Sequence, residues 1–488
     1  MALAAFLLLG LIKRKGSRRG YNLPPGPTPW PYGELMLLRF GSFPVVVGSS
    51  VAMARLVLKT HDAVFIDRPR TASGKHTTYG YADITWSPYG AYWRQARRIC
   101  VTELFSARRV ASFEHIRADE VRALVRGLFA AASSGRDGGA VHLNRDHLST
   151  LSMNVITRMV LGKRFFGEGA DAAEGPVSTL SEFKWMMDEL LLLNGVLNVG
   201  DWIPSVDWMD LQGYVRRMKK VGKMFDAFME HVLDEHSERR RREGEAFVAR
   251  DMVDVLMDLA DDPSLEIKLG RVGVKAFTQD LIAGGTESSS VTVEWALSEL
   301  LKNPAIFATA TDELDIVVGR GRWVTKKDIP NLPYLEAIMK ETMRMHPIVP
   351  LLIPRVARDG AAVAGYDIPK GARVLINVWT IGRDPELLDA AEEFMPERFI
   401  GSRIDVKGQD FELLPFGSGR RMCPGYNLGL KVMQLSLANL LHWFAWRLPE
   451  GMEKEELSMD EVFGLSTMRK YPLQVVVEPR LPVQLYSL

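Results

Sequence analysis

Apolar residues recur at helical spacing along most of the chain. The period of about 3.6 residues is clearest over residues 183–197 and 215–232. A longer helix is predicted over 272–302, where Asn303 and Pro304 end it, and a largely buried helix over 426–446. These patterns predict a mainly α fold.

Runs that favour strands are fewer and predict only a small β region. Residues 35–40 and 45–47 fit the two strands of a hairpin, and residues 365–378 fit a second hairpin that turns at 369–371. Neither an internal repeat nor a Gly/Ser-rich or acidic linker divides the chain. We therefore expect residues 32–488 to form one large domain.

The first 31 residues follow a different pattern. Residues 1–12 are apolar, residues 13–19 include five Lys or Arg, and a Pro-rich stretch follows up to Pro31. A cleaved signal peptide would carry its basic residues before the apolar run. The order here predicts a short membrane anchor (1–12) and a basic stop with a Pro-rich hinge (13–31), with the body on the cytosolic side.

Composition narrows the class of protein. The chain has 61 Lys and Arg against 60 Asp and Glu, a balance that gives no sign of nucleic-acid binding. The basic run 239–242 is flanked by glutamates, so we interpret it as a solvated helix end. Two cysteines, Cys100 and Cys423, argue against a disulfide scaffold. Dinucleotide, P-loop and serine-hydrolase motifs are absent from the sequence.

Cys423 lies in the segment 416–425, which reads Phe-Gly-Ser-Gly-Arg-Arg-Met-Cys-Pro-Gly. Gly419 and Gly425 are expected to let the main chain approach the sulfur closely, and Pro424 opens a helix whose positive end favours a thiolate. One cysteine cannot form a zinc or iron-sulfur cage, but it can be the axial ligand of a haem. The alternative is a glycine-rich loop around a structural cysteine.

Two further patterns carry candidate chemistry. Trp93 and Arg97 share one face of a helix, so they can address a single anionic group; otherwise Arg97 is simply solvated. Gly284 and Gly285 lie in the middle of the predicted helix 272–302. Each costs about 1 kcal/mol relative to alanine, so they need a structural reason, and close packing against a neighbour is one.

The segment 416–425 resembles, position for position, the haem-binding signature of the cytochrome P-450 family. The resemblance implies that Cys423 is the ligand of the iron of haem b. It also implies that Gly284 and Gly285 leave room for dioxygen beside an acid, Glu287, and a hydroxyl, Ser288, where most members have threonine. The other cofactor-binding residues that it implies are Phe416 and Arg421 in the loop, and Trp93, Arg97 and Arg355 at the propionates.

The resemblance also assigns residues to structure and to the substrate pocket. Glu341, Arg344 and Arg398 match a buried charge network of the family. The segments 348–353 and 463–468 are implied to line the pocket. Members normally carry a helical segment between the hinge and the first strand, whereas here Pro31 leads almost directly into that strand. This suggests an altered gene model or an internal deletion.

The likeness is greatest to plant microsomal members. It implies a monooxygenase of the endoplasmic reticulum membrane, with its catalytic domain on the cytosolic face, that takes electrons from NADPH-cytochrome reductase and oxidises an apolar flavonoid or terpenoid. Residues 283–288 also resemble a branch that includes oxidative lyases forming homoterpenes. The remaining alternatives are a peroxide-isomerising haem enzyme and a non-enzymatic haem-binding protein.

Overall fold

The computed structural model describes residues 22–26, 33–133, 140–166, 176–177, 179–462 and 464–486. The predicted anchor, most of the predicted hinge and Phe463 lie outside these residues. Within the described ranges, no helix combines the length and the apolar character needed to cross a membrane.

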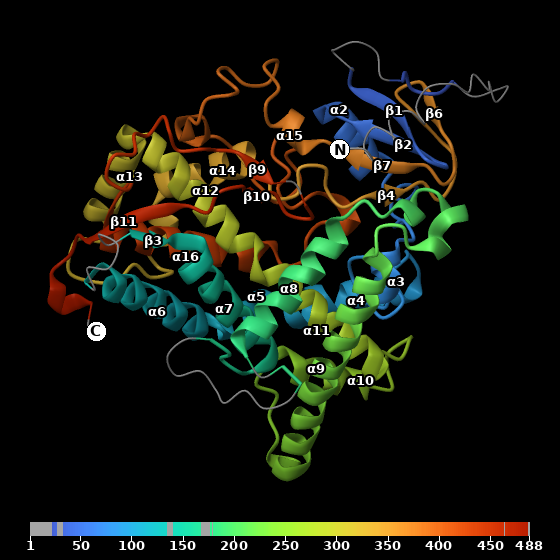
Figure 1. The fold of residues 1–488 in the computed structure, drawn as a ribbon, viewed down its shortest axis with the longest axis horizontal. Coiled ribbons are helices and arrows are strands. Elements are labelled where there is room, and N and C mark those ends of the chain that lie inside the picture. Colours follow the sequence, from blue (N-terminus) through green and yellow to red (C-terminus); the bar gives the residue numbers. More distant parts are fainter. Residues whose placement is uncertain are drawn as a thin grey trace.

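Helices make up most of the molecule, as predicted (Figure 1). The predicted helices 183–197 and 215–232 correspond to α8 and α9, and α8 begins with a capping box between Thr179 and Glu182. The α-helices are α2 (Val51–Arg55), α3 (Ala72–Thr77), α4 (Ala91–Ile99), α5 (Ala107–Ser112), α6 (Glu114–Ser133), α7 (Ser149–Leu161), α8 (Leu180–Gly195), α9 (Tyr214–Glu243), α10 (Met252–Ala260), α11 (Gly270–Thr286), α12 (Ser288–Lys302), α13 (Pro304–Val317), α14 (Pro333–Met345), α15 (Val378–Ile381) and α16 (Tyr426–Trp443).

Helix α12 runs through the centre of the hydrophobic core. Every residue over 289–301 is buried, because α7, α14 and α16 pack around the helix. Its two buried carboxylates have partners: Glu294 accepts the Leu473 N–H at 2.9 Å, and Glu299 lies 2.6 Å from His346 Nε2. This buried helix carries one wall of the site described below.

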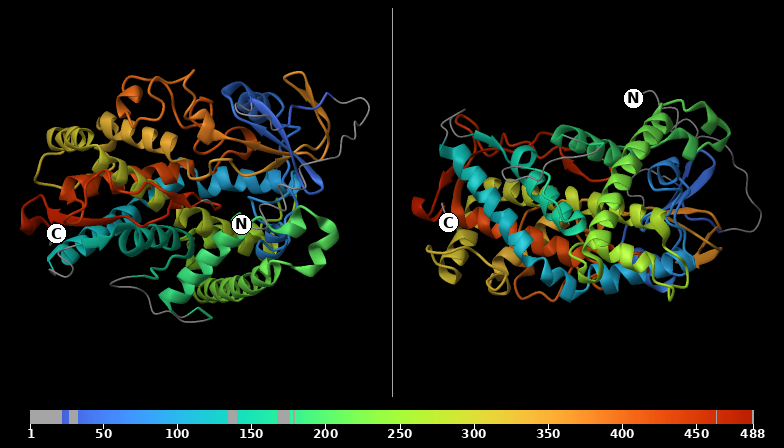
Figure 2. Two further views of the ribbon diagram at one scale, coloured as in Figure 1. Left: turned by 45° about the horizontal axis from the view of Figure 1, so that its top comes forward. Right: turned by 90° about the horizontal axis from the view of Figure 1, so that it is seen from below.

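A four-stranded sheet lies at the end of the molecule opposite the C-terminus (Figures 1 and 2). Its strand order is β1 (Leu35–Phe40), β2 (Phe43–Gly48), β7 (Arg373–Ile376) and β4 (Arg355–Val356). Strands β1 and β2 pair antiparallel from Leu35 opposite Gly48 to Phe40 opposite Phe43, which confirms the first predicted hairpin. The sheet places Arg355 at its inner edge.

The turn of the second hairpin was predicted at the wrong residues. Strand β6 (Tyr366–Ile368) pairs with β5 (Ala361–Val363), so the chain reverses at Ala364 and Gly365. Both residues have positive φ, 50° and 82°, as a tight two-residue hairpin turn requires. The predicted turn at 369–371 instead leads the chain into β7, which pairs parallel with β2.

Helix α16 is shorter than predicted because its end joins a sheet. The helix stops at Trp443, and β8 (Phe444–Arg447) pairs with β11 (Gln474–Pro479), which also pairs with β3 (Ala140–His142). Between β8 and β11 in the sequence, β9 (Glu461–Val462) and β10 (Met468–Arg469) pair as a two-stranded hairpin. The apolar residues 444 and 446 alternate with exposed ones, which is a strand pattern.

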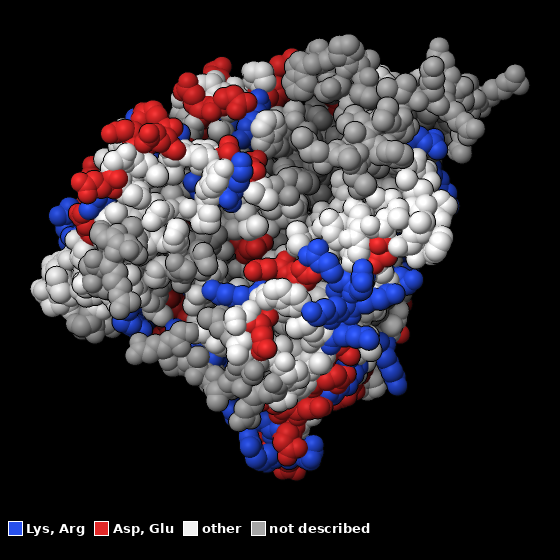
Figure 3. All heavy atoms as spheres, in the orientation of Figure 1, with Lys and Arg blue, Asp and Glu red and all other residues white. Residues whose placement is uncertain are grey.

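The basic run near the end of α9 is neutralised locally. Arg239 pairs with Asp254, Arg240 lies 3.1 Å from Asp258, and Arg241 lies 3.0 Å from Glu238. Basic and acidic side chains accordingly intermingle on this end of the molecule (Figure 3).

Candidate active site

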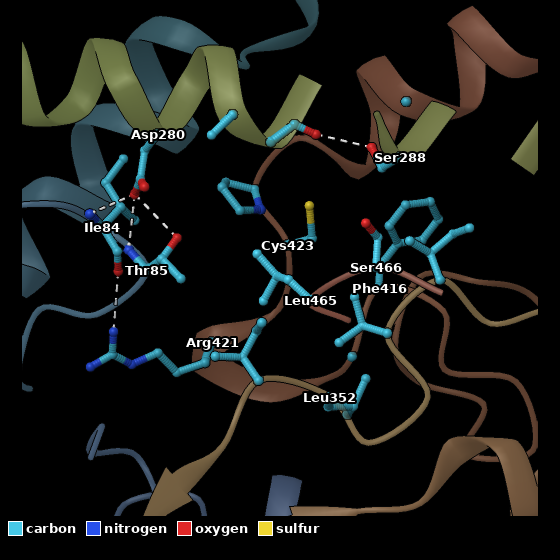
Figure 4. A pocket seen from close by; sticks show the side chains of 18 of the residues that line it. Ile84, Thr85, Asp280, Ser288, Leu352, Phe416, Arg421, Cys423, Leu465 and Ser466 are labelled. Atoms are coloured by element: carbon cyan, nitrogen blue, oxygen red, sulfur yellow. Dashed lines mark hydrogen bonds between the residues drawn. The ribbon is translucent and has the colours of Figure 1, made fainter. Parts of the chain in front are cut away.

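A cavity of about 350 Å³ lies between the α11–α12 region and the loop that precedes α16. Its lining is mostly apolar and includes Ile348, Val349, Leu352 and Ile353, as predicted for the pocket segment 348–353. Leu465 and Ser466, from the second predicted lining loop, close another side (Figure 4).

The sulfur of Cys423 points into this cavity (Figure 4). The backbone N–H of Cys423 donates to the carbonyl oxygen of Phe416 at 3.0 Å, which closes the loop around the residue. Burial raises the pKa of the Cys423 thiol, while the N–H groups of Gly425 and Tyr426 and the charge of Arg97 favour the thiolate. A cation facing the sulfur from the cavity would therefore complete this site.

Gly419 and Gly425, the two glycines singled out from the sequence of this loop, have different roles. Gly419 has φ +70°, and a Cβ there would lie 2.2 Å from the carbonyl oxygen of Leu58, so only glycine fits. Gly425 has φ −88°, and a Cβ would lie 4.0 Å from the Cys423 sulfur and 3.6 Å from Phe105. The backbone N–H of Gly425 bonds to the Cys423 sulfur, so the main chain approaches the sulfur as expected, although a side chain at 425 would meet no close neighbour.

Arg421 is fixed by three backbone carbonyl oxygens. It donates to Ile66 at 3.0 Å, Ile84 at 3.2 Å and Ser87 at 2.7 Å. Its guanidinium carbon lies 4.1 Å from the centre of the Trp93 ring. The ring of Trp93 therefore supports Arg421. Trp93 Nε1 donates to the carbonyl oxygen of Ile84, so its N–H already has a partner. Arg97 lines the cavity beside them.

Two further arginines reach the same side of the cavity. Arg355 donates to Asp62 Oδ1 at 2.8 Å and to the Ser418 carbonyl oxygen at 3.0 Å. Arg68, which the sequence analysis missed, donates to the carbonyl oxygens of Ile353 and Pro354 at 2.7 and 2.9 Å. The only local signal for Arg68 is an arginine two positions after the apolar residues 64–66, behind Asp67.

Burial lowers the pKa of all four arginines, and Asp62, Asp67 and Asp83 offset only part of this effect. Burial and the neighbouring Arg355 lower the pKa of Arg421 to about 9. Burial, Arg421 and Arg355 likewise lower the pKa of Arg68, and burial lowers that of Arg97. An anionic group in the cavity would relieve this repulsion. The Cys423 thiol and the four arginines around this apolar cavity together fit a flat apolar cofactor that carries both a metal ion and carboxylates.

The opposite wall contains the glycine pair. The predicted single helix 272–302 is broken at Glu287, which has φ −108° and separates α11 from α12. A Cβ on Gly284 would meet nothing within 4 Å, so this glycine opens the wall to the cavity. A Cβ on Gly285 would lie 2.6 Å from Ile156 Cδ1, so this glycine permits close packing. Close packing, the alternative weighed from the sequence, therefore holds for Gly285, and the room for dioxygen beside Gly284 stays a prediction.

Glu287 and Ser288 both line the cavity but do not bond to each other. Glu287 Oε2 accepts the hydroxyl hydrogen of Ser466 at 2.6 Å. Ser288 Oγ donates to the carbonyl oxygen of Gly284 at 2.9 Å (Figure 4). Burial raises the pKa of Glu287, the Ser466 hydroxyl lowers it, and Asp188 raises it further. The carboxyl group is therefore closer to accepting a proton at neutral pH than an exposed glutamate is.

Asp280 joins the two walls and was also missed in the sequence. Its carboxylate accepts the backbone N–H groups of Ile84 and Thr85 at 2.8 and 3.0 Å and the Thr85 hydroxyl at 3.1 Å (Figure 4). The carbonyl oxygen of Ile84 in turn accepts from Arg421 and Trp93. Helix α11 is thereby tied to the arginine side of the cavity.

Comparisons with known proteins agree with this geometry. The sequence model of the family described as Cytochrome P450 matches residues 31–476. Trimethyltridecatetraene synthase of Zea mays is 49% identical over 530 aligned positions, covering 99% of this chain and 94% of that protein. Flavonoid 3'-monooxygenase of Petunia hybrida is 41% identical, covering 98% and 97%.

A solved structure, described as a zebra fish cytochrome P450 with progesterone, is 26% identical with a TM-score of 0.74. It covers 92% of this chain and 97% of that chain. The resemblance found in residues 416–425, the mainly α fold and the expected enzyme class are therefore confirmed. The chain belongs to the cytochrome P450 family, whose members are haem-dependent monooxygenases that act on small molecules and take electrons from redox partners.

Proposed function

We propose that the chain binds haem b (iron protoporphyrin IX) through Cys423 and oxidises an apolar plant secondary metabolite, a flavonoid or a terpenoid. The observation that carries the proposal is the placement of the Cys423 sulfur and four arginines, whose pKa values are lowered by burial, around one apolar cavity. When bound, the haem supplies the activation of dioxygen, so that one oxygen atom enters the substrate.

The protein side chains hold this cofactor in a defined orientation. Arg97, Arg355 and Arg421 are placed to receive its carboxylates, because each lines the cavity and has a lowered pKa from burial. Trp93 keeps Arg421 in position through its ring. Phe416 packs beside the thiolate loop and lines the same cavity.

Glu287 and Ser288 supply protons on the opposite wall. A buried carboxyl group with a raised pKa can hold a proton at Oε2 and release it to water in the cavity. Ser288 presents a hydroxyl beside the opening left by Gly284. Proton movement through these groups is the step that we assign to them.

Two substrate classes are supported by different relatives. The similarity to a flavonoid 3'-monooxygenase supports hydroxylation of a flavonoid-like ring compound. The greater similarity to trimethyltridecatetraene synthase supports the second candidate function, oxidative C–C cleavage that forms a homoterpene. The apolar lining residues suit both, so product analysis with each substrate class separates them.

We also propose an NADPH-cytochrome reductase as the electron donor and the endoplasmic reticulum membrane as the location. Arg94 and Arg98 on α4 and Lys431 on α16 are exposed on the cysteine side of the cavity and are candidate docking contacts. The apolar segment 1–12 and its basic flank support the membrane anchor, with residues 32–488 in the cytosol.

An internal deletion after Pro31 remains a prediction. An alignment of 530 positions is longer than this 488-residue chain, so the relative holds residues with no counterpart here. Insertion of the relative's segment after Pro31 should raise the yield of haem-loaded protein. Equal thermal stability of the two proteins would show that the shorter segment is harmless.

The CO-bound spectrum of the reduced protein tests the cofactor site. The absorption band typical of thiolate ligation should be present and should disappear in Cys423→Ala. Cys100→Ala is the matched control, because burial raises the pKa of Cys100 to about 12 and keeps its thiol protonated. Survival of the band in Cys423→Ala would rule out the assignment of Cys423.

Turnover with purified reductase tests the proton-supplying residues. Glu287→Gln should slow product formation by about 10² to 10⁴ while leaving substrate binding largely intact. Ser288→Ala should release more hydrogen peroxide per NADPH, and Ser288→Thr should lower that release. Absence of both substrate-induced NADPH consumption and product would favour a non-enzymatic haem protein, and product formation without reductase would favour a peroxide isomerase.

A further inference from the structure

The bond between Ser466 and Glu287 links two segments that are 179 residues apart in the sequence. Glu287 lies at the break between α11 and α12, whereas Ser466 lies in the loop between strands β9 and β10. Both residues line the cavity. The acid on one wall is therefore held by a hydroxyl on another.

The position of this loop is fixed from three sides. Strands β9 and β10 pair with Val462 opposite Met468, which sets the base of the loop. The backbone N–H of Thr467 donates to the Ile348 carbonyl oxygen at 2.8 Å. A Cβ on Gly195, at the end of α8, would lie 2.3 Å from the backbone nitrogen of Leu465, so α8 lies directly against the loop backbone.

The hydroxyl of Ser466 donates a hydrogen bond to the Glu287 carboxylate, whereas the hydroxyl of Ser288 donates to a backbone carbonyl oxygen. An ionised carboxylate only accepts hydrogen bonds, so the Ser466 hydrogen points to Glu287 Oε2 and the oxygen of Ser466 retains lone pairs for a water molecule. The Ser288 hydrogen is committed to Gly284. Ser466 is thus the cavity hydroxyl bonded to the acid in the part of the chain that the structure describes.

We propose that Ser466 is a positioning residue for Glu287, which orients the carboxylate and links the β9–β10 loop to proton supply. The inference rests on the proposed role of Glu287 as the acid. Leu465 lines the cavity next to Ser466, so a bound substrate that contacts Leu465 lies beside the residue that holds the carboxylate. Substrate fit and proton supply are then coupled through one hydrogen bond.

The test compares Ser466→Ala and Ser466→Thr with the matched control Thr467→Val in the reductase-coupled assay. The Thr467 hydroxyl is buried without a hydrogen-bond partner among the described residues, so its removal should leave turnover unchanged. Ser466→Ala should slow product formation about tenfold or more, the usual loss for a hydrogen bond to a charged group, and should raise peroxide release. Ser466→Thr keeps the hydroxyl and should restore most of both quantities.

A double-mutant cycle with Glu287→Gln gives the decisive readout. In the Glu287→Gln background, Ser466→Ala should slow turnover further by less than about twofold, because the bond is already altered. Multiplicative slowing, or an unchanged product-to-peroxide ratio in Ser466→Ala alone, would overturn the inference while leaving the role of Glu287 intact. A normal rate in Glu287→Gln would remove the acid itself and the inference with it. The CO-bound band of every variant must match wild type, which shows that the cofactor site is folded.

Discussion

Two buried clusters of charged side chains differ in whether each arginine bonds directly to a carboxylate. In the first, Arg344 donates to both carboxylate oxygens of Glu341 at 2.7 Å, and Arg398 donates to the same carboxylate at 3.1 Å. The remaining guanidinium donors of Arg344 and Arg398 reach backbone carbonyl oxygens, including those of Gly382 and Ala391. This cluster joins α14 to the segment 382–398, and we call it complete because both of its arginines bond directly to the shared carboxylate.

In the second cluster, four arginines surround the cavity. Arg421 and Arg68 donate only to carbonyl oxygens among the described residues, and Arg355 has one direct carboxylate partner, Asp62. Burial and mutual repulsion lower the pKa of Arg421 to about 9. The complete cluster thus lies at a junction between structural elements, whereas the incomplete one lines the cavity.

The largest predicted effect comes from breaking the complete cluster. Glu341→Gln leaves Arg344 and Arg398 without their buried carboxylate, and we expect a loss of about 3–5 kcal/mol in the free energy of unfolding. The matched control on α14 is Glu336→Gln, which removes an ion pair with Lys340 in which Glu336 is exposed. That control should cost at most about 0.5 kcal/mol. Denaturant unfolding measures both values, and equal losses would show that the cluster is not a structural element.

A substitution in the incomplete cluster should weaken the retention of haem. Arg421→Met removes one charge-assisted contact, worth about 1.5–3 kcal/mol, so haem dissociation should become roughly 10- to 100-fold faster. Transfer of haem to an acceptor protein measures the rate. Arg420→Met is the control, because Arg420 is exposed and lies 3.5 Å from Asp62. Arg421→Met should change the unfolding free energy of the apoprotein much less than Glu341→Gln does. A larger change in Arg421→Met would contradict the comparison of the two clusters.

Gly284 and Gly285 in α11 show a similar contrast, because one faces the cavity and the other packs against a neighbouring helix. Gly285→Ala places a methyl group against Ile156 and should destabilise the fold by about 1–3 kcal/mol. Gly284→Ala meets no neighbour and should raise the unfolding free energy by up to about 1 kcal/mol, while it narrows the cavity. Thermal unfolding together with substrate-binding spectra distinguishes the two, and loss of stability in both variants would contradict the contrast.

The smallest effect concerns a third buried network on α9 and α10. His236 Nδ1 lies 2.8 Å from the Val232 carbonyl oxygen and Nε2 lies 3.1 Å from Asp251 Oδ2, so both nitrogens donate and the ring is charged. Burial lowers the pKa of His236, but the hydrogen bond to Asp251 and the charge of that residue outweigh it, and the net pKa is raised.

The sign of the pH effect follows from this raised pKa. The stabilisation is complete below the ordinary histidine pKa of about 6.5 and is lost as the pH rises through the higher folded value, with a slope of at most about 1.4 kcal/mol per pH unit. Unfolding of wild type and His236→Gln between pH 6 and 9 measures it. A pH-independent difference between the two proteins would exclude a charged His236.

The sequence by itself determined the parts of this protein whose chemistry is local. Residues 416–425 identify the thiolate loop and the family, and the helical period identifies the mainly α fold. Glu341, Arg344 and Arg398 could also be assigned, because their short motifs are long-standing features of the family and the structure brings them together. Each of these predictions depends on residues within a few positions of one another, or on a known resemblance.

Only the tertiary structure decided which partners each site residue has. Arg68 and Asp280 carry no recognisable motif, and Ser466 was expected only as part of the pocket-lining segment 463–468. All three matter because the fold places them against segments 17 to 286 residues away. The break at Glu287 and the separate roles of Gly284 and Gly285 likewise depend on which neighbour faces each residue. The physical reason is that helical period and propensity act over a few residues, whereas burial, repulsion between charges and hydrogen-bond satisfaction depend on groups that meet only in the folded chain.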